Sequence, residues 1–207
     1  MRCHLILFAA LIGLAQPAAA QDALGCHKDQ RLVADESLAK AKELTLAAAT
    51  AVGDTADYVR WFGTYSDQNA EDVRATLKAV VAAIRTGGVT LHCNTRGDDG
   101  CTAGEYAWVY PHRPYEVQLC PPFFGLPPLT ALQPGERRSN YGTREGTIVH
   151  EVSHFLRVAD TSDHCYSRRE CREMAQDDAI RAIDNADSYQ YFTEDVTYYA
   201  RQLPTDK

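Results

Sequence analysis

The cysteines of this chain constrain its fold most, because they follow an N-terminal stretch typical of an export signal. Residues 1–4 are short and positively charged, the apolar run 5–15 is too short to cross a bilayer, and Ala18-Ala19-Ala20 supplies small residues for a signal peptidase. We therefore expect residues 1–20 to be a signal peptide and residues 21–207 to form the working protein.

The expected mature chain keeps an even number of cysteines: Cys26, Cys93, Cys101, Cys120, Cys165 and Cys171. In an exported chain this predicts about three disulfides, although such a set allows about 15 pairings. The spacing lacks the paired short sets of a structural zinc site. Cys165 and Cys171 could close a short local loop. An oxidising location follows, either the periplasm or the outside of the cell.

Length and charge limit the remaining possibilities. The mature chain suits one domain with a real core. Without Arg2 it carries 20 basic and 28 acidic side chains, which argues against nucleic acid or an anionic membrane as partner and mildly favours cationic ligands. No later segment is apolar enough for a membrane helix, and nothing requires more than a monomer.

Periodicity predicts a helix-rich α+β fold. Helices are expected over residues 35–52, 69–85, 147–158, 168–186 and 188–202, and short strands over 89–93, 106–110 and 117–120, forming a small sheet or hairpin. The proline- and glycine-containing stretch 121–142 predicts an irregular loop.

His150-Glu151-Val152-Ser153-His154 is an H-E-x-x-H motif within one predicted helix. Residues four apart lie on one helix face, so both imidazoles can point at one metal ion. Glu151 lies beside them, close enough to take a proton from a water that zinc acidifies. The motif predicts a site for one Zn²⁺ ion with hydrolytic chemistry.

A catalytic zinc needs a third protein ligand, and three carboxylates are candidates. Asp160 follows His154 by six residues, as in the metzincin pattern, but Arg157 occupies the place of that pattern's glycine. Glu173 begins an E-x-x-x-D sequence that resembles the gluzincin arrangement, although a charged helix face produces such spacings freely. Asp163 follows His154 by nine residues.

The segment 159–166 resembles the aspzincins, the deuterolysin family that includes the peptidyl-Lys metalloendopeptidases, in which H-E-x-x-H precedes a G-T-x-D loop. Further pieces of the family pattern recur in order: Gly25-Cys26, Trp61-Phe62-Gly63, Cys101-Thr102-Ala103-Gly104, the segment Tyr106 to Cys120, and Asn185-Ala186-Asp187 with Tyr191-Phe192. The resemblance implies a zincin-like single domain and a secreted zinc endopeptidase that acts on protein or peptide substrates.

Carried over to this chain, the resemblance implies His150, His154 and Asp163 as zinc ligands and Glu151 as general base. Tyr166 would donate to the oxyanion of the tetrahedral intermediate. It also implies disulfides Cys26–Cys93 and Cys101–Cys120, which leaves Cys165–Cys171 as a pair outside the family's usual set. Only residues 21–25 precede the family-like start, so we expect no removable propeptide.

Two positions depart from the family pattern. Asp160 replaces the loop glycine, where the backbone is expected to need a positive φ. Asp187 and the acidic residue three positions later line the lysine pocket of the lysine-specific members, but here the later residue is Gln190. One carboxylate attracts a lysine ammonium less strongly than two, so cleavage before lysine is expected with a broader pattern as the alternative.

The sequence leaves two other interpretations of the site open. One is a gluzincin-type peptidase with Glu173 as third ligand. The other is a non-catalytic secreted module that binds zinc or peptides, against which the presence of Glu151 argues.

Overall fold

The computed structural model describes residues 22, 24–86, 88–131 and 142–199, so the expected signal peptide lies outside the described residues. The elements follow one another in this order: α1 (Lys28–Ala51), α2 (Ala56–Phe62), α3 (Asp67–Arg85), β1 (Thr90–Cys93), β2 (Ala107–Val109), β3 (Glu116–Leu119), the 3-10 turns η1 (Pro121–Gly125) and η2 (Leu129–Ala131), α4 (Arg144–Ser153), α5 (Arg168–Asp177), α6 (Ala179–Ile183), α7 (Ala186–Glu194) and the π-helical turn η3 (Asp195–Tyr199). The helix-rich α+β prediction is confirmed. No helix within the described residues is long and apolar enough to cross a membrane.

The strands form one small sheet in the order β1-β3-β2. β1 runs parallel to β3, with Leu91 opposite Val117, and β2 runs antiparallel to β3, with Val109 opposite the same valine. Within the described part of the chain, β2 therefore lies at an edge of the sheet and leaves one row of its backbone groups without a strand partner.

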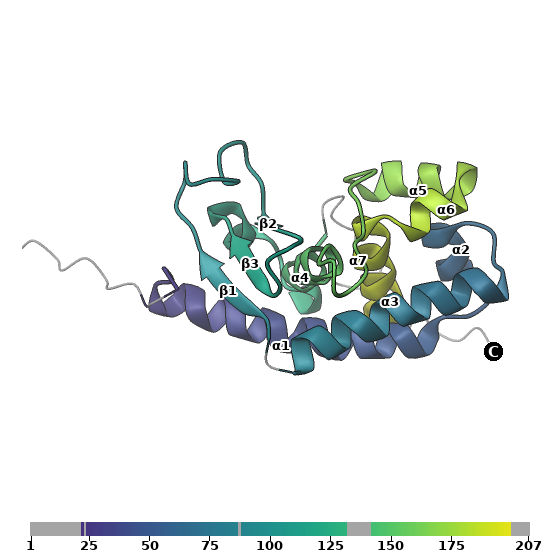
Figure 1. Cartoon of the computed structure of the whole chain (residues 1–207), viewed down its shortest axis with the longest axis horizontal. Coiled ribbons are helices and arrows are strands. Elements are labelled where there is room, and N and C mark those ends of the chain that lie inside the picture. The colour runs from purple at the N-terminus through teal and green to yellow at the C-terminus, as the bar shows by residue number, and fades with distance from the viewer. Residues whose placement is uncertain (1–21, 23, 87, 132–141, 200–207) are drawn as a thin grey trace, which may run out of the picture.

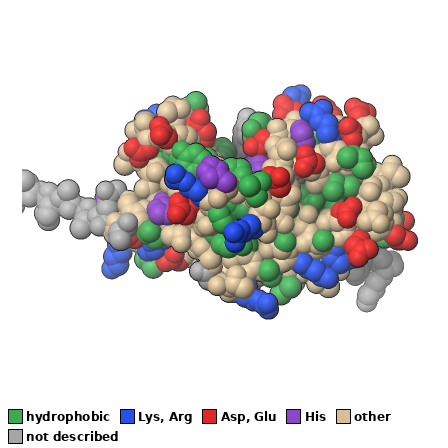
Figure 2. All heavy atoms as spheres, viewed as in Figure 1, with side chains coloured by type: hydrophobic (Ala, Val, Ile, Leu, Met, Phe, Trp, Pro, Cys, Tyr) green, Lys and Arg blue, Asp and Glu red, His purple; other side chains and the backbone are tan. Residues whose placement is uncertain are grey.

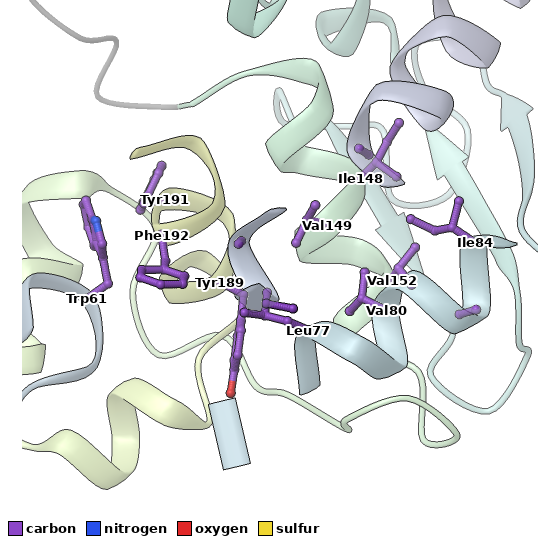
Figure 3. Packing of buried hydrophobic residues seen from close by; sticks show 14 of the residues in the cluster. Trp61, Leu77, Val80, Ile84, Ile148, Val149, Val152, Tyr189, Tyr191 and Phe192 are labelled. Atoms are coloured by element: carbon purple, nitrogen blue, oxygen red, sulfur yellow. The ribbon is translucent and has the colours of Figure 1, made fainter. Parts of the chain in front are cut away.

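Helix α4 lies at the centre of the molecule, between the sheet on one side and α5, α6 and α7 on the other, with α1 and α3 beneath it (Figure 1). Its inner face meets the predicted apolar stripe of α3, so that Leu77 and Val80 lie near Val149 and Val152 (Figure 3). All four side chains are fully buried. Each such burial stabilises the fold by about 1.5–3 kcal/mol and fixes the position of the helix that carries the H-E-x-x-H motif.

A second part of the same core is aromatic. Trp61 from α2 packs against Tyr191 from α7 with ring centroids 5.1 Å apart, and Phe62 contacts Phe192 at 5.2 Å. These contacts hold α7 against α2 (Figure 3), and α7 in turn carries Asp187, one of the predicted site residues.

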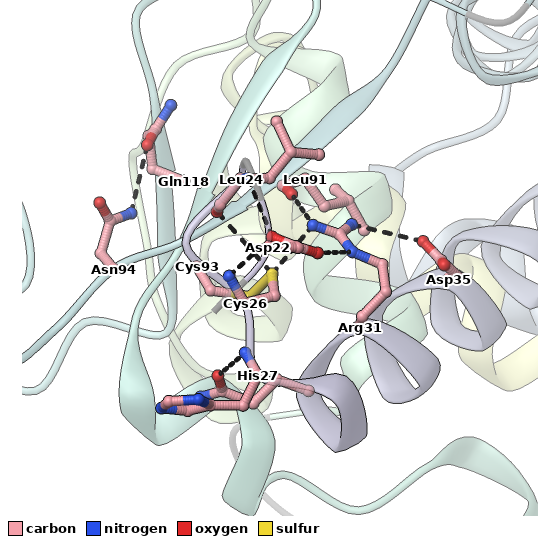
Figure 4. The surroundings of a disulfide bond; sticks show 11 residues. Asp22, Leu24, Cys26, His27, Arg31, Asp35, Leu91, Cys93, Asn94 and Gln118 are labelled. Atoms are coloured by element: carbon pink, nitrogen blue, oxygen red, sulfur yellow. Dashed lines mark hydrogen bonds and ion pairs between the residues drawn. A yellow bond between two sulfur atoms is a disulfide. The ribbon is translucent and has the colours of Figure 1, made fainter. Parts of the chain in front are cut away.

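The three predicted disulfides are confirmed: Cys26–Cys93, Cys101–Cys120 and Cys165–Cys171. The first joins the start of α1 to the end of β1 (Figure 4). The second joins the loop before β2 to the residue after β3. The third closes a loop of six residues' separation between the H-E-x-x-H helix and α5.

Several helix predictions were wrong in their limits. The helix predicted over 147–158 begins at Arg144 and ends at Ser153. The Ser153 hydroxyl donates to the His150 carbonyl at 2.6 Å and lies 2.6 Å from the Thr161 hydroxyl. The last residue of α4 is therefore bonded to the loop that follows, and the helix ends there.

The helix predicted over 168–186 is two helices. Asp178 has an extended backbone, and its side chain accepts from Arg181 N at the start of α6. The predicted first helix starts earlier, at Lys28, and the last one starts at Ala186 and passes into η3 at Asp195. Helix α2 was not predicted, although Thr55 caps it by accepting from Tyr58 N. The loop predicted over 121–142 contains η1 and η2, and its residues 132–141 lie outside the described part.

Candidate metal and active site

Three ligand atoms converge beside α4. His150 Nε2 and His154 Nε2 are 3.1 Å apart, and Asp163 Oδ1 lies 3.2 Å from the first and 3.3 Å from the second. Zinc–ligand bonds of about 2.0–2.1 Å in a tetrahedron place neighbouring ligand atoms about 3.3 Å apart. The observed triangle therefore has the size that one zinc ion requires.

The outer nitrogens of both histidines are already occupied. His150 Nδ1 lies 2.7 Å from Asp187 Oδ1, and His154 Nδ1 lies 2.6 Å from the Thr161 carbonyl oxygen. Both acceptors require Nδ1 to carry the proton, which leaves the two Nε2 lone pairs facing each other. Two lone pairs at 3.1 Å need a cation or a proton between them, and a metal ion meets this need.

In the absence of a metal, protons would compete for this site. Burial opposes the charge on His150, but hydrogen bonds to Asp163 and Asp187 outweigh it and raise the pKa of the imidazole well above its usual value. Burial also acts against the charge on Asp163, yet its two histidine partners lower the pKa of that carboxyl far below its ordinary range. The site holds its negative ligand ionised and is poised to bind a cation.

Glu151 projects from the same helix into the same space. Its carboxylate and the two imidazoles offer atoms within 4.8 Å of one another. The side chain is 5 % exposed and has no hydrogen-bond partner among the described residues, and burial raises the pKa of its carboxyl. A carboxylate with a raised pKa and free oxygens beside a metal site is suited to accept a proton from water.

Tyr166 lies three residues beyond Asp163 and is 63 % exposed. Partial burial, together with the charge and hydrogen bond of Asp163, raises the pKa of the phenol. The hydroxyl therefore stays protonated near neutral pH and can donate a hydrogen bond towards the metal site.

A cavity of about 530 Å³ opens over these residues. Its walls come from the loop before β2, from β2 itself, from α4, from the loop 161–166 and from α7. It contains the carboxylates of Glu105, Glu151, Asp163 and Asp187 and no lysine or arginine. In the space-filling view a notch separates the side that carries the sheet from the side that carries α5 and α6 (Figure 2).

The two residues predicted to bind substrate both lie on α7 and line this cavity. Asp187 is 5 % exposed, and one of its carboxylate oxygens accepts a hydrogen bond from His150, a contact that the sequence did not predict. Gln190 is 3 % exposed, and its amide nitrogen donates to Glu194 Oε1 at 3.5 Å. The Gln190 amide nitrogen therefore points towards Glu194.

The alternative third ligands lie elsewhere. Glu173 is exposed on α5, and Asp160 is exposed in the turn after α4 with φ of 52°. In the described part of the chain, neither forms an ion pair with His150 or His154. The positive φ expected at Asp160 is confirmed, whereas the helix predicted to reach residue 158 ends at Ser153.

The loop that carries Asp163 is fixed by residues that the sequence analysis did not single out for this role. Asn185 is fully buried, and its side-chain oxygen accepts from His164 N at 2.8 Å and Cys165 N at 3.2 Å. Ser162 N donates to the Asp184 carbonyl at 2.7 Å, and Ala186 N donates back to the Ser162 carbonyl at 3.0 Å. The sequence identifies Asn185-Ala186-Asp187 only as part of the family pattern, and the fold places this segment against the loop.

Comparisons with known proteins place the chain among metallopeptidases. The sequence profile of the aspzincin family, whose description is lysine-specific metallo-endopeptidase, matches residues 47–194. An extracellular protease of Aeromonas hydrophila is 35% identical over 137 residues, which are 66% of this chain and 35% of that protein. A peptidyl-Lys metalloendopeptidase of Pleurotus ostreatus is 32% identical over 140 residues, which are 68% of this chain and 74% of that protein.

A solved structure has the same fold. The zinc peptidase from Grifola frondosa superposes with a TM-score of 0.70 at 25% identity, covering 82% of this chain and 97% of that one. The present chain therefore spans nearly all of that peptidase structure but only about a third of the Aeromonas protein.

Proposed function

The chain belongs to the aspzincin family of metallo-endopeptidases, as its motifs predicted, and we propose that it is a zinc-dependent endopeptidase that hydrolyses peptide bonds in the cavity over α4. His150, His154 and Asp163 would hold one zinc ion. The observation that carries this proposal is the triangle of their three ligand atoms, with both outer histidine nitrogens occupied and the unpartnered Glu151 carboxylate alongside.

Zinc, when bound, supplies a Lewis acid that acidifies water to a pKa of about 7 and polarises the scissile carbonyl. Glu151 then takes the proton of the attacking water and passes it to the leaving amine. Tyr166 donates a hydrogen bond to the oxygen that becomes negative, which favours the transition state over the substrate. Asp187 and the Thr161 carbonyl keep the two imidazoles oriented throughout.

The edge of the sheet would hold the substrate backbone. Ala107, Trp108 and Val109 of β2 line the cavity, and β2 pairs only with β3 among the described strands. An extended peptide can add to such an edge through main-chain hydrogen bonds, which are independent of its sequence.

We further propose a preference for lysine after the scissile bond. Relatives of the chain are named peptidyl-Lys metalloendopeptidases, and the described cavity lining has four carboxylates and no lysine or arginine. Two features weaken this preference: Asp187 shares its charge with His150, and Gln190 stands where the lysine-specific members have a second acid. We therefore expect lysine to be favoured but other residues to be accepted.

Digestion of a denatured, lysine-containing protein by the purified, zinc-loaded chain tests the activity. Cuts mapped by mass spectrometry should disappear when zinc is chelated and should concentrate before lysine. Glu151→Gln should lower the rate of cutting at least about a thousandfold while leaving one zinc bound per chain, as measured by atomic absorption. Cuts without lysine preference would remove the specificity, and a folded, zinc-loaded chain that cuts nothing would favour the peptide-binding module.

We also propose that residues 1–20 direct export, that residues 21–207 act as one monomeric domain, and that the protein works in the periplasm or outside the cell. Three disulfides support an oxidising location. N-terminal sequencing of the protein recovered from each cell fraction, with light scattering of the purified chain, tests these points. A mature chain that retains residues 1–20 would contradict the first.

A further inference from the structure

Tyr166 depends on its neighbours for its position, because its own side chain is largely exposed. On its N-terminal side, the backbone is fixed by Asn185, which accepts from His164 N and Cys165 N. On its C-terminal side, Ser167 caps α5 by accepting from Glu170 N, and Arg168 is the first residue of that helix. The placement of Tyr166 therefore depends on where α5 begins.

Arg168 fixes that point through a buried ionic contact with the end of α7. It is 6 % exposed, donates to Asp195 Oδ1 at 2.9 Å and forms a second ion pair with Glu194. Its guanidinium also lies 4.6 Å from the centre of the Tyr191 ring and 5.4 Å from that of Trp61. A planar fork with several donors can meet two carboxylates and two rings at once, which a lysine ammonium cannot.

The two carboxylates are themselves fixed to other parts of the site. Glu194 Oε1 accepts from the backbone and the hydroxyl of Thr143, both at 2.8 Å, and Thr143 is the N-cap of α4. Asp195 Oδ2 accepts from Trp61 Nε1 at 3.1 Å. The arginine thus connects the start of α5 to the end of α7 and, through Glu194, to the helix that carries the H-E-x-x-H motif.

A contribution to stability does not by itself explain this contact. Burying one cation with two carboxylates carries a large desolvation cost, and apolar replacements of such clusters are often neutral or stabilising. The arrangement does supply geometry, since it fixes the direction in which the chain leaves Tyr166.

We propose that Arg168 is a positioning residue that holds Tyr166 in place for the hydrolytic step, acting through the start of α5. The inference rests on the proposed function, in which Tyr166 donates to the oxyanion. Arg168 contacts α7 and its C-cap Asp195 as well as Trp61 of α2, and it is not among the described residues that line the cavity, so its effect would be indirect.

A double-mutant cycle between Arg168→Lys and Tyr166→Phe tests this. Arg168→Lys keeps a cation between the carboxylates but loses the fork, and it should lower kcat about tenfold or more with KM within about twofold. In the Tyr166→Phe background the same change should lower kcat by less than about twofold. Arg169→Lys, an exposed change on the same helix, should leave kcat unaltered. Equal losses in both backgrounds, or no loss in the first, would overturn the proposal.

A charge-free variant separates positioning from stability. Arg168→Met combined with Glu194→Gln and Asp195→Asn removes the three buried charges and leaves only Arg60, which is partly exposed and lies 3.6 Å from Asp195 Oδ2 in the parent. This variant should fold with a Tm within a few degrees of the parent. Its kcat should still fall about tenfold or more, and that loss should also vanish in the Tyr166→Phe background. Full activity in this variant would overturn the proposal. An inactive parent chain would instead refute the proposed function.

Discussion

Among the described residues other than glycine, Asp160 is the one with a positive φ. Its φ of 52° lies in the left-handed region, which costs most residues about 1–2 kcal/mol and aspartate less. Asp160→Ala should therefore lower the free energy of unfolding by about 1 kcal/mol, whereas Asp160→Gly should stay within about 0.5 kcal/mol. Urea unfolding with the disulfides intact measures both. Equal stability of the alanine and glycine variants would show that the turn is not strained.

Asp187 is proposed both to orient His150 and to bind substrate, and a measurement of zinc affinity distinguishes these two roles. The 2.7 Å contact with His150 Nδ1 orients a metal ligand, and loss of such outer partners typically weakens metal binding 10–100-fold. Asp187→Ala should raise the zinc Kd by about that factor, and Asp187→Asn, which keeps an acceptor oxygen, by less. Competition with a coloured chelator gives both values. An unchanged zinc Kd with a lost lysine preference would restrict Asp187 to substrate binding.

At the scale of elements, a polar tether fixes the start of α1 beside the first disulfide (Figure 4). Asp22 accepts from Arg31 Nε at 2.8 Å and from Cys26 N at 3.0 Å, and Arg31 also donates to the Leu91 carbonyl. The hydrogen bond from Arg31, followed by that from the Cys26 backbone, lowers the pKa of Asp22 from 3.8 to about 2.

A lowered pKa in the folded state means that the unfolded chain binds the proton more readily. The tether therefore stabilises the fold fully above pH 4, and its contribution is lost as pH falls through about 2. An NMR titration of the Asp22 carboxyl carbon should give a midpoint near 2, and Arg31→Met should move it towards 3.8. A midpoint that is unchanged in Arg31→Met would assign the lowered pKa of Asp22 to the backbone donors alone.

The elements also show what the sequence could predict. Local spacing was enough for the apolar stripe of α3 and for the histidine pair on α4, because both depend on residues three or four apart. The end of α4 was missed because it depends on the contact of Ser153 with Thr161 across a loop, and the parallel pairing of β1 with β3 is equally non-local. Nor could spacing choose Asp163 over Glu173; the family resemblance did.

The contact of His150 with Asp187 joins residues 37 positions apart, and the cluster of Arg168 with Glu194 joins residues 26 apart. Neither has a local signature, since Asp187 looks like a helix-starting acid and Arg168 like one charge in a charged helix. The residues that support the site were for this reason much harder to predict than the residues proposed to bind the metal.

In the whole molecule, the proposed metal site lies where two parts of the fold meet. His150 and His154 belong to the central helix α4, whereas Asp163 belongs to a loop that is hydrogen-bonded to the junction of α6 and α7 through Ser162 (Figure 1). Bound zinc would join these parts by direct bonds.

Zinc should therefore stabilise the fold as well as support the chemistry. At a free zinc concentration about 100 times the Kd, binding contributes about 2.7 kcal/mol, which for a domain of this size raises Tm by roughly 5 to 10 °C. Differential scanning calorimetry of the chelated and zinc-loaded chain measures the shift, which should grow with zinc concentration and be absent in His154→Ala. Magnesium should give none, since it avoids imidazole ligands. If zinc binds but leaves Tm unchanged, the unfolded chain must bind zinc as tightly as the folded chain, which would contradict a site that the fold assembles from α4 and the loop of Asp163.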